Sequence, residues 1–121
     1  MDTIKILPII VIILVISIVF FAYFFQKPSL KESKEQAINL CIQLCQEAKS
    51  KGMNLENGPC LSDNNPKWNL TKWVCDIAHW PRQEIDNKKE NQCNAWWDAY
   101  LSHKEIHFVE LFPNCSLIRA V

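Results

Sequence analysis

Hydrophobic residues are concentrated near the start of the chain, in a run of twenty residues without a charge. Residues 6–25 read ILPIIVIILVISIVFFAYFF. A helix rises about 1.5 Å per residue, so this run reaches about 30 Å, the thickness of a bilayer's hydrocarbon core. We therefore expect residues 6–25 to form a transmembrane helix that contacts the lipid bilayer.

A cleaved signal and a buried core helix both fit this run less well. A cleaved secretory signal has a shorter apolar core followed by small residues, whereas this run ends in Phe24-Phe25-Gln26-Lys27. A buried core helix is rarely apolar on every face over such a length. The sequence favours an uncleaved signal-anchor, with residues 1–28 as the anchor and its flanks and residues 29–121 as one small cysteine-rich domain.

Beyond the anchor, hydrophobic positions recur every three or four residues. This spacing predicts an amphipathic helix over about residues 30–51, into which the transmembrane helix continues. Ser29 with Glu32 matches a capping box at its start, and Gly52 is a typical stop. The predicted buried stripe comprises Ala37, Ile38, Cys41, Leu44, Cys45 and Ala48.

The rest of the chain predicts three short strands and a second helix. Residues 73–77 alternate as a half-buried strand does, and two β-rich runs at 105–112 and 116–121 indicate a hairpin. A short helix is predicted over 94–103. Residues 53–72 and 82–91 are rich in turn-forming or polar residues and are predicted to be loops. We expect an α+β fold in which the amphipathic helix packs on a small antiparallel β-sheet.

Cysteine usage indicates disulfide cross-links. All six cysteines lie beyond the predicted anchor, without the C-x-x-C pairs typical of zinc ribbons. Cys41 and Cys45 lie one helical turn apart, so we expect them to bond to different partners, with Cys75 on a strand below as one of these. The disulfide candidates are Cys41, Cys45, Cys60, Cys75, Cys93 and Cys115.

Charge and glycine content argue against nucleic-acid binding. Thirteen Lys+Arg residues are balanced by thirteen Asp+Glu residues, and the chain has only two glycines. A basic surface and a phosphate-binding glycine loop are therefore both missing from the sequence. We expect no nucleic-acid partner and no cofactor.

Signals for the orientation of the anchor conflict. Lys5 stands alone before the anchor, whereas three lysines follow it closely, so the positive-inside rule places the domain in the cytoplasm. Disulfides, however, persist in oxidising compartments, and the chain holds two acceptor sequons, Asn69-Leu70-Thr71 and Asn114-Cys115-Ser116. We give the cysteines more weight and expect a single-pass cell-membrane protein with an extracellular C-terminal domain.

Two groups of residues offer candidate chemistry. A Cys2His2 metal site is conceivable, although its spacing is not diagnostic. Its candidate ligands are Cys93, His103, His107 and Cys115. Asp76 and His79 beside Cys75 resemble a nucleophile with a base and an orienting group. Disulfide bonding and ordinary packing account for both groups more simply, so we expect neither a metal site nor a catalytic cysteine.

The tryptophans are candidates for either core packing or contact with a partner. The five tryptophans exceed what a core of this size normally needs, and aromatic rings on loops are good anchors for a protein or glycan partner. Filling of a small core is the simpler role for them. The candidate partner contacts are Trp68, Trp80, Trp96 and Trp97.

Four segments carry a family resemblance: GPCLS at 58–62, WVCDIAHWPR at 73–82, DNKKENQC at 86–93 and HFVELFPNCSLIR at 107–119. They resemble a family of small, membrane-anchored, cysteine-containing archaeal proteins with no assigned activity. The resemblance implies an archaeal surface protein. We expect a disulfide-stabilised interaction or structural module rather than an enzyme; the alternatives are a thiol-redox or metal-handling membrane protein and a pilin-like assembly subunit.

Overall fold

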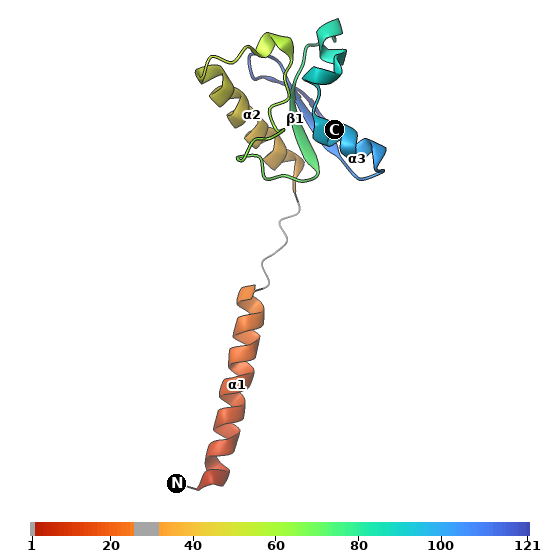
Figure 1. The fold of residues 1–121 in the computed structure, drawn as a ribbon. Helices are drawn as coiled ribbons and strands as arrows, with labels where there is room; N and C mark the ends of the chain where they lie inside the picture. Colours follow the sequence, from red (N-terminus) through yellow and green to blue (C-terminus); the bar gives the residue numbers. More distant parts are fainter. Residues whose placement is uncertain (1, 26–31) are drawn as a thin grey trace. The chain divides into compact units, whose positions relative to one another are not determined.

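A computed structural model describes residues 2–25 and 32–121, which belong to two separate units (Figure 1). The first unit holds helix α1 (Thr3–Phe25), whose 23 residues reach about 34 Å. None of its side chains is buried. This helix is long and apolar enough to cross a membrane. The predicted boundary between residues 28 and 29 lies outside the described residues.

Helix α2 (Lys34–Ser50) opens the second unit with its own N-cap. Ser33 is extended, and its hydroxyl accepts a hydrogen bond from Gln36 N at 3.1 Å. The predicted start near residue 30 is therefore wrong, because Glu32 instead binds Thr71 and Lys72 ahead of the first strand. The predicted cap Ser29 lies outside the described residues. Gly52 follows the helix with a φ of 75°, as predicted for the stop.

The sheet has three strands, in the order β1 (Trp73–Ile77), β2 (His107–Leu111) and β3 (Leu117–Ala120). Strands β2 and β3 form the predicted antiparallel hairpin, but β1 pairs with β2 in parallel, so the sheet is mixed. An antiparallel sheet was predicted, and this detail is wrong. Parallel neighbours need a long crossover connection that usually contains a helix, and α3 (Asn94–Leu101) lies within that connection.

Short turns occupy the predicted loops. The loop before β1 contains the 3-10 turn η1 (Leu55–Asn57), and the polar segment after β1 contains η2 (Glu84–Asn87) and η3 (Lys89–Asn91). Residues 59–61 pair with the outer edge of β1 through Leu61 N to Cys75 O and Ile77 N to Pro59 O. This pairing shields an edge that β1 would otherwise present to solvent.

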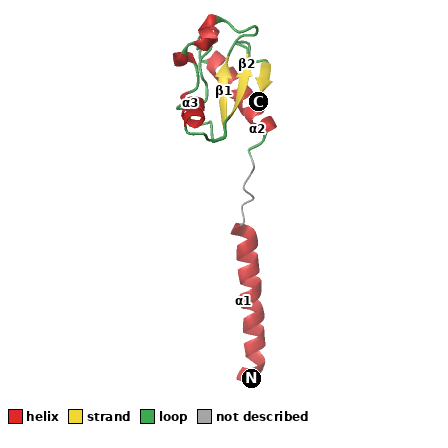
Figure 2. Ribbon diagram, turned by 90° about the vertical axis from the view of Figure 1, so that its right-hand side faces the viewer, coloured by secondary structure: helices red, strands yellow, loops and turns green. Residues whose placement is uncertain are grey.

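The core lies between α2 and one face of the sheet (Figure 2). Five residues of the predicted helical stripe are buried: Ala37, Cys41, Leu44, Cys45 and Ala48. They meet Cys75, Ile77, Val109, Leu111 and Ala120 of the strands. Burial of such side chains contributes about 25 cal/mol per Å² of apolar surface removed from water, so this layer is the main source of the domain's stability.

Three disulfides reinforce this core. Cys41 bonds to Cys75 on β1, and Cys45 bonds to Cys115 in the β2–β3 turn, so one helical turn is joined to two parts of the sheet layer. Cys60 bonds to Cys93 at the start of α3. Among the described residues no cysteine is free.

Replacing both members of one disulfide by alanine should lower the free energy of unfolding. The Cys45–Cys115 bond spans 70 residues, for which the chain-entropy relation gives about 4 kcal/mol. The Cys60–Cys93 bond spans 33 residues and should cost about 0.6 kcal/mol less. Guanidinium unfolding of the full chain in micelles, followed by tryptophan fluorescence, measures both. Unfolding midpoints unchanged in both double variants would contradict the cross-linked core.

Candidate functional site

The face of the sheet opposite α2 carries charged residues in its centre. Because side chains alternate along a strand, residues next to Cys75 and Val109 in sequence point away from α2. Asp76 of β1 is the register partner of Glu110 of β2, and Glu110 is the partner of Arg119 of β3. Three charged side chains therefore form a row across the sheet, which we call the charged row.

The charged row forms one side of a cavity of about 190 Å³. Val74 and Phe108 extend the same face of the sheet and give it an apolar surface. The crossover connection supplies the other walls, namely Arg82, Gln92 and Trp96. A cavity of this size admits a single small group, such as one ring with a polar substituent.

Glu110 is held by both arginines of the chain. Its Oε1 accepts a hydrogen bond from Arg82 Nη1 at 2.9 Å, and its Oε2 accepts one from Arg119 Nε at 3.0 Å. The Glu110 side chain is only 8% exposed, so these charge-assisted bonds compensate for its desolvation. Arg82 also donates to Asp86 O and Asn87 Oδ1, which fixes the arginine against η2.

Asp76 has a different environment from Glu110. Its Oδ1 is buried and has no hydrogen-bond partner among residues 2–25 and 32–121. Burial, and then the negative charge of Glu110, raise the pKa of Asp76 to about 9, although the charge of Arg82 opposes this. At neutral pH Asp76 is therefore a neutral carboxylic acid that can donate a proton in a hydrogen bond.

His79 follows β1 and belongs to a second polar group beside the cavity. Its Nδ1 lies 2.9 Å from Asp86 Oδ1, and its Nε2 lies 3.4 Å from Glu56 Oε2. The bond to Asp86 raises the pKa of His79 against the opposing effect of burial. Gly58 lies against this group with a φ of 68°, and a Cβ there would come within 3.0 Å of Asp86 Oδ1. The group connects the η1 loop to η2.

Three of the four candidate metal ligands considered in the sequence are committed to other bonds. Cys93 and Cys115 form disulfides with two different cysteines, so neither offers a thiolate. His107 stacks on Trp73 and bonds to Glu105, and His103 follows α3 with a φ of 55°. The predicted Cys2His2 alternative therefore does not form in this structure.

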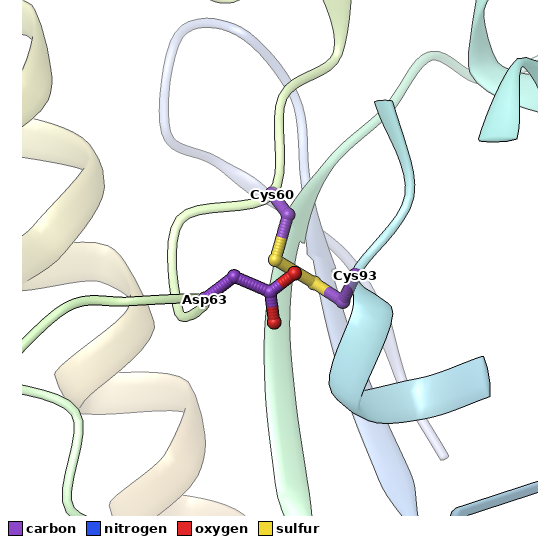
Figure 3. A group of neighbouring side chains, drawn as sticks. All are labelled: Cys60, Asp63 and Cys93. Carbon is purple, nitrogen blue, oxygen red and sulfur yellow. A yellow bond between two sulfur atoms is a disulfide. The ribbon is translucent and has the colours of Figure 1, made fainter. Parts of the chain in front are cut away.

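A different group of potential ligands, Cys60, Asp63 and Cys93, lies close together (Figure 3). Its two sulfur atoms belong to one disulfide, which leaves a single carboxylate. That carboxylate accepts hydrogen bonds from Asn94 N at 2.6 Å and Ala95 N at 3.4 Å. Asp63 thus caps the first turn of α3 from a distant loop, and the group is structural.

The residues at 75–79 that resemble a catalytic group in the sequence, a resemblance we set aside there, do not come together in the structure. Cys75 points to α2 and is oxidised, whereas Asp76 points to the opposite face. Both ring nitrogens of His79 are bonded to carboxylates from other segments. A nucleophile and its base are therefore not brought together here.

The four candidate tryptophans occupy different environments. Trp68 packs against the core and donates to Trp73 O at 2.9 Å, which is a structural role. Trp96 lines the cavity and stacks on Tyr100 with ring centroids 5.1 Å apart, and Trp97 contacts it edge-on. Trp80 is 60% exposed, near Arg119. Trp80, Trp96 and Trp97 thus remain accessible for contact.

The sequence interpretation missed the charged row and Arg82. The available signal was a carboxylate at the fourth position of each of two buried strands, WVCDI and HFVEL, in a chain with only two arginines. Buried carboxylates require partners, so two lone arginines are the natural ones.

No protein-family model matches this chain, and neither a curated protein nor a solved structure matches it. The chemistry of the cavity is therefore inferred from its own residues. Its lining holds one neutral acid, one carboxylate and two cations beside apolar side chains.

Replacing Asp76 by asparagine should change how stability depends on pH. An unfolded aspartate ionises near pH 3.8, whereas folded Asp76 keeps its proton up to about pH 9. Between these values only the folded state binds this proton, so wild-type stability falls as pH rises, by at most about 1.4 kcal/mol per pH unit. Asparagine does not titrate, so the free energy of unfolding of the variant does not fall in this way. The variant should therefore be more stable than the wild type at neutral pH.

Melting temperatures of wild type, Asp76→Asn and the exposed control Asp98→Asn, measured from about pH 4 to pH 8, test this. The advantage of Asp76→Asn should grow with pH, while Asp98→Asn should follow the wild type. Parallel curves for wild type and Asp76→Asn would show that Asp76 is ionised in the folded protein.

Proposed function

We propose that this protein is a membrane-anchored extracellular module that binds a small ligand in the cavity beside the charged row. The observation that carries the proposal is a mostly apolar cavity of about 190 Å³ whose lining includes Asp76, a residue whose buried Oδ1 has no hydrogen-bond partner in the described part of the chain. Buried polar groups are nearly always paired, and unpaired ones are typical of sites that await a partner. A pocket with a few convergent polar groups on an apolar surface is the usual form of a ligand site.

The three disulfides support an extracellular location. Structural disulfides persist outside the cytoplasm, and here two of them join α2 to β1 and to the β2–β3 turn, while the third joins the segment beside β1 to the start of α3. The flanking lysines favour the opposite orientation, since Lys27, Lys31 and Lys34 outnumber Lys5. The exterior placement is preferred because the three disulfides would be open to reduction in the cytoplasm. We give this argument more weight than the bias that the flanking lysines exert on insertion.

Binding fits the charged row better than catalysis does. Glu110 cannot act as a base or nucleophile while each of its oxygens accepts from a guanidinium group. Thiol chemistry would require the opening of one of the three disulfides, because no cysteine among the described residues is free. The metal-handling alternative lacks its cysteine ligands, because both are oxidised.

The pilin-like alternative requires one helix that runs from the anchor into the domain. Helix α2 instead begins at Lys34 after an extended Ser33.

An archaeal cell-surface role, as the family resemblance implies, is part of our proposal. The chemical group that binds in the cavity belongs to a protein, a glycan or a free small molecule at that surface.

Lysine labelling on intact cells tests the orientation. Lys89 and Lys104 are exposed, so a membrane-impermeant amine reagent should modify both if the domain is extracellular. Labelling is preferable to proteolysis because a cross-linked domain resists proteases. A cytoplasmic marker protein in the same cells should stay unmodified. Modification of these lysines only after cell lysis would place the domain inside.

A mixed panel of small acids, amides, amines and sugars tests the cavity as a binding site. In isotope-labelled full-length protein in lipid nanodiscs, at least one class should shift the indole N–H signal of Trp96. Phe108→Trp fills the cavity and should abolish the shift, whereas Phe112→Trp, the same change outside the cavity lining, should preserve it. The absence of shifts with every class, or their persistence in Phe108→Trp, would refute the proposed binding function.

A further inference from the structure

Two groups in the cavity have unused hydrogen-bonding capacity. Arg119 donates to Glu110 through Nε, but within the described part of the chain no acceptor bonds to either of its Nη atoms. Its guanidinium lies over the Phe108 ring, 5.1 Å from the centroid, and its side chain is 43% exposed. Asp76 lines the same cavity, and its buried Oδ1 has no partner among the described residues. The cavity lining therefore includes a half-exposed cationic donor and a more buried carboxyl group.

The charges that line the cavity do not cancel. Arg82 and Arg119 contribute two positive charges, and Glu110 contributes one negative charge. With Asp76 protonated, the lining carries one net positive charge (2 − 1 = 1). Asp86, the other nearby carboxylate, is paired with His79 outside the lining. The pocket is partly enclosed and mostly apolar, so a bound group with one negative charge would make it electrically neutral.

We propose that the cavity binds the carboxylate of a small ligand with a flat apolar body, between the Arg119 guanidinium and the Asp76 carboxyl. This inference rests on the proposed binding function and adds the class of ligand. The guanidinium donates to the ligand carboxylate in a charge-assisted bond, and the Asp76 O–H donates a second bond. The apolar body lies along Val74, Phe108 and Trp96.

Other ligand charges match the cavity less well. An ammonium group would face two guanidinium groups and would need Asp76 to ionise beside Glu110. A neutral sugar would leave the Nη atoms of Arg119 without a charged partner. The groups that face Asp76 are Glu110 of β2, Arg82 and Asp86 of the crossover connection, and Arg119 of β3. Because burial and Glu110 raise the Asp76 pKa to about 9, the donated proton is present at neutral pH and is lost in alkali.

Calorimetry with three matched probes tests the inference on the full chain in nanodiscs. Benzoate, benzamide and benzylammonium share one ring and differ in charge. Benzoate should bind about tenfold or more tightly than either of the others near neutral pH. Its affinity should fall again by about tenfold as Asp76 ionises in alkali. The exposed control Lys104→Gln should leave all three affinities unchanged.

Variants of the two proposed contacts complete the test. Arg119→Gln should weaken benzoate binding by about tenfold, and Arg119→Lys, which keeps the charge and the pairing with Glu110, should weaken it less. Asp76→Asn should retain binding near neutral pH, because its amide still donates, and should lose the alkaline decline. Equal or tighter binding of benzamide or benzylammonium would overturn the carboxylate assignment while leaving a binding site. An alkaline decline retained in Asp76→Asn would also overturn it.

Discussion

The attachment of α2 to one face of the sheet is the constraint on which the rest of the domain depends. Cys41 and Cys45 are fully buried and bond to β1 and to the β2–β3 turn, so the helix cannot separate from this face without breaking covalent bonds. The helix covers the apolar side of the sheet. Since strand side chains alternate, the opposite side carries the other residues of each strand, which include the charged row together with Val74 and Phe108.

The parallel pairing of β1 and β2 determines what covers that second side. A parallel neighbour requires a long connection, and here the connection brings Arg82, Gln92 and Trp96 over the free face. A direct hairpin between the two strands would have left Glu110 without one of its two cations. The cavity therefore depends on the parallel direction of β1 and β2 as well as on the side chains that line it.

Local patterns predicted the elements well and their mutual arrangement less well. The helical stripe, the stop at Gly52, the β2–β3 hairpin and the choice of Cys75 as the partner of one helical cysteine all follow from spacing. Spacing did not indicate which of Cys41 and Cys45 bonds to Cys75. The direction of β1 depends on contacts distant in sequence, which periodicity does not encode. The site was missed for a similar reason: Arg82 lies in a polar segment that resembles a solvated loop, and only the folded chain brings it to Glu110.

The charged row has a consequence for which fold the chain can adopt. A slip of one residue in the pairing of a strand turns every side chain of that strand to the other face. A slipped β2 would place Glu110 against α2 without its arginines and would expose Val109 and Leu111 to water. A slipped β1 would carry Cys75 away from Cys41. The charged row, which includes Asp76 and Arg119 of the proposed ligand site, thus also discriminates against incorrect strand pairings through Glu110. The chemistry of the pocket and the uniqueness of the fold therefore depend on the same row of side chains.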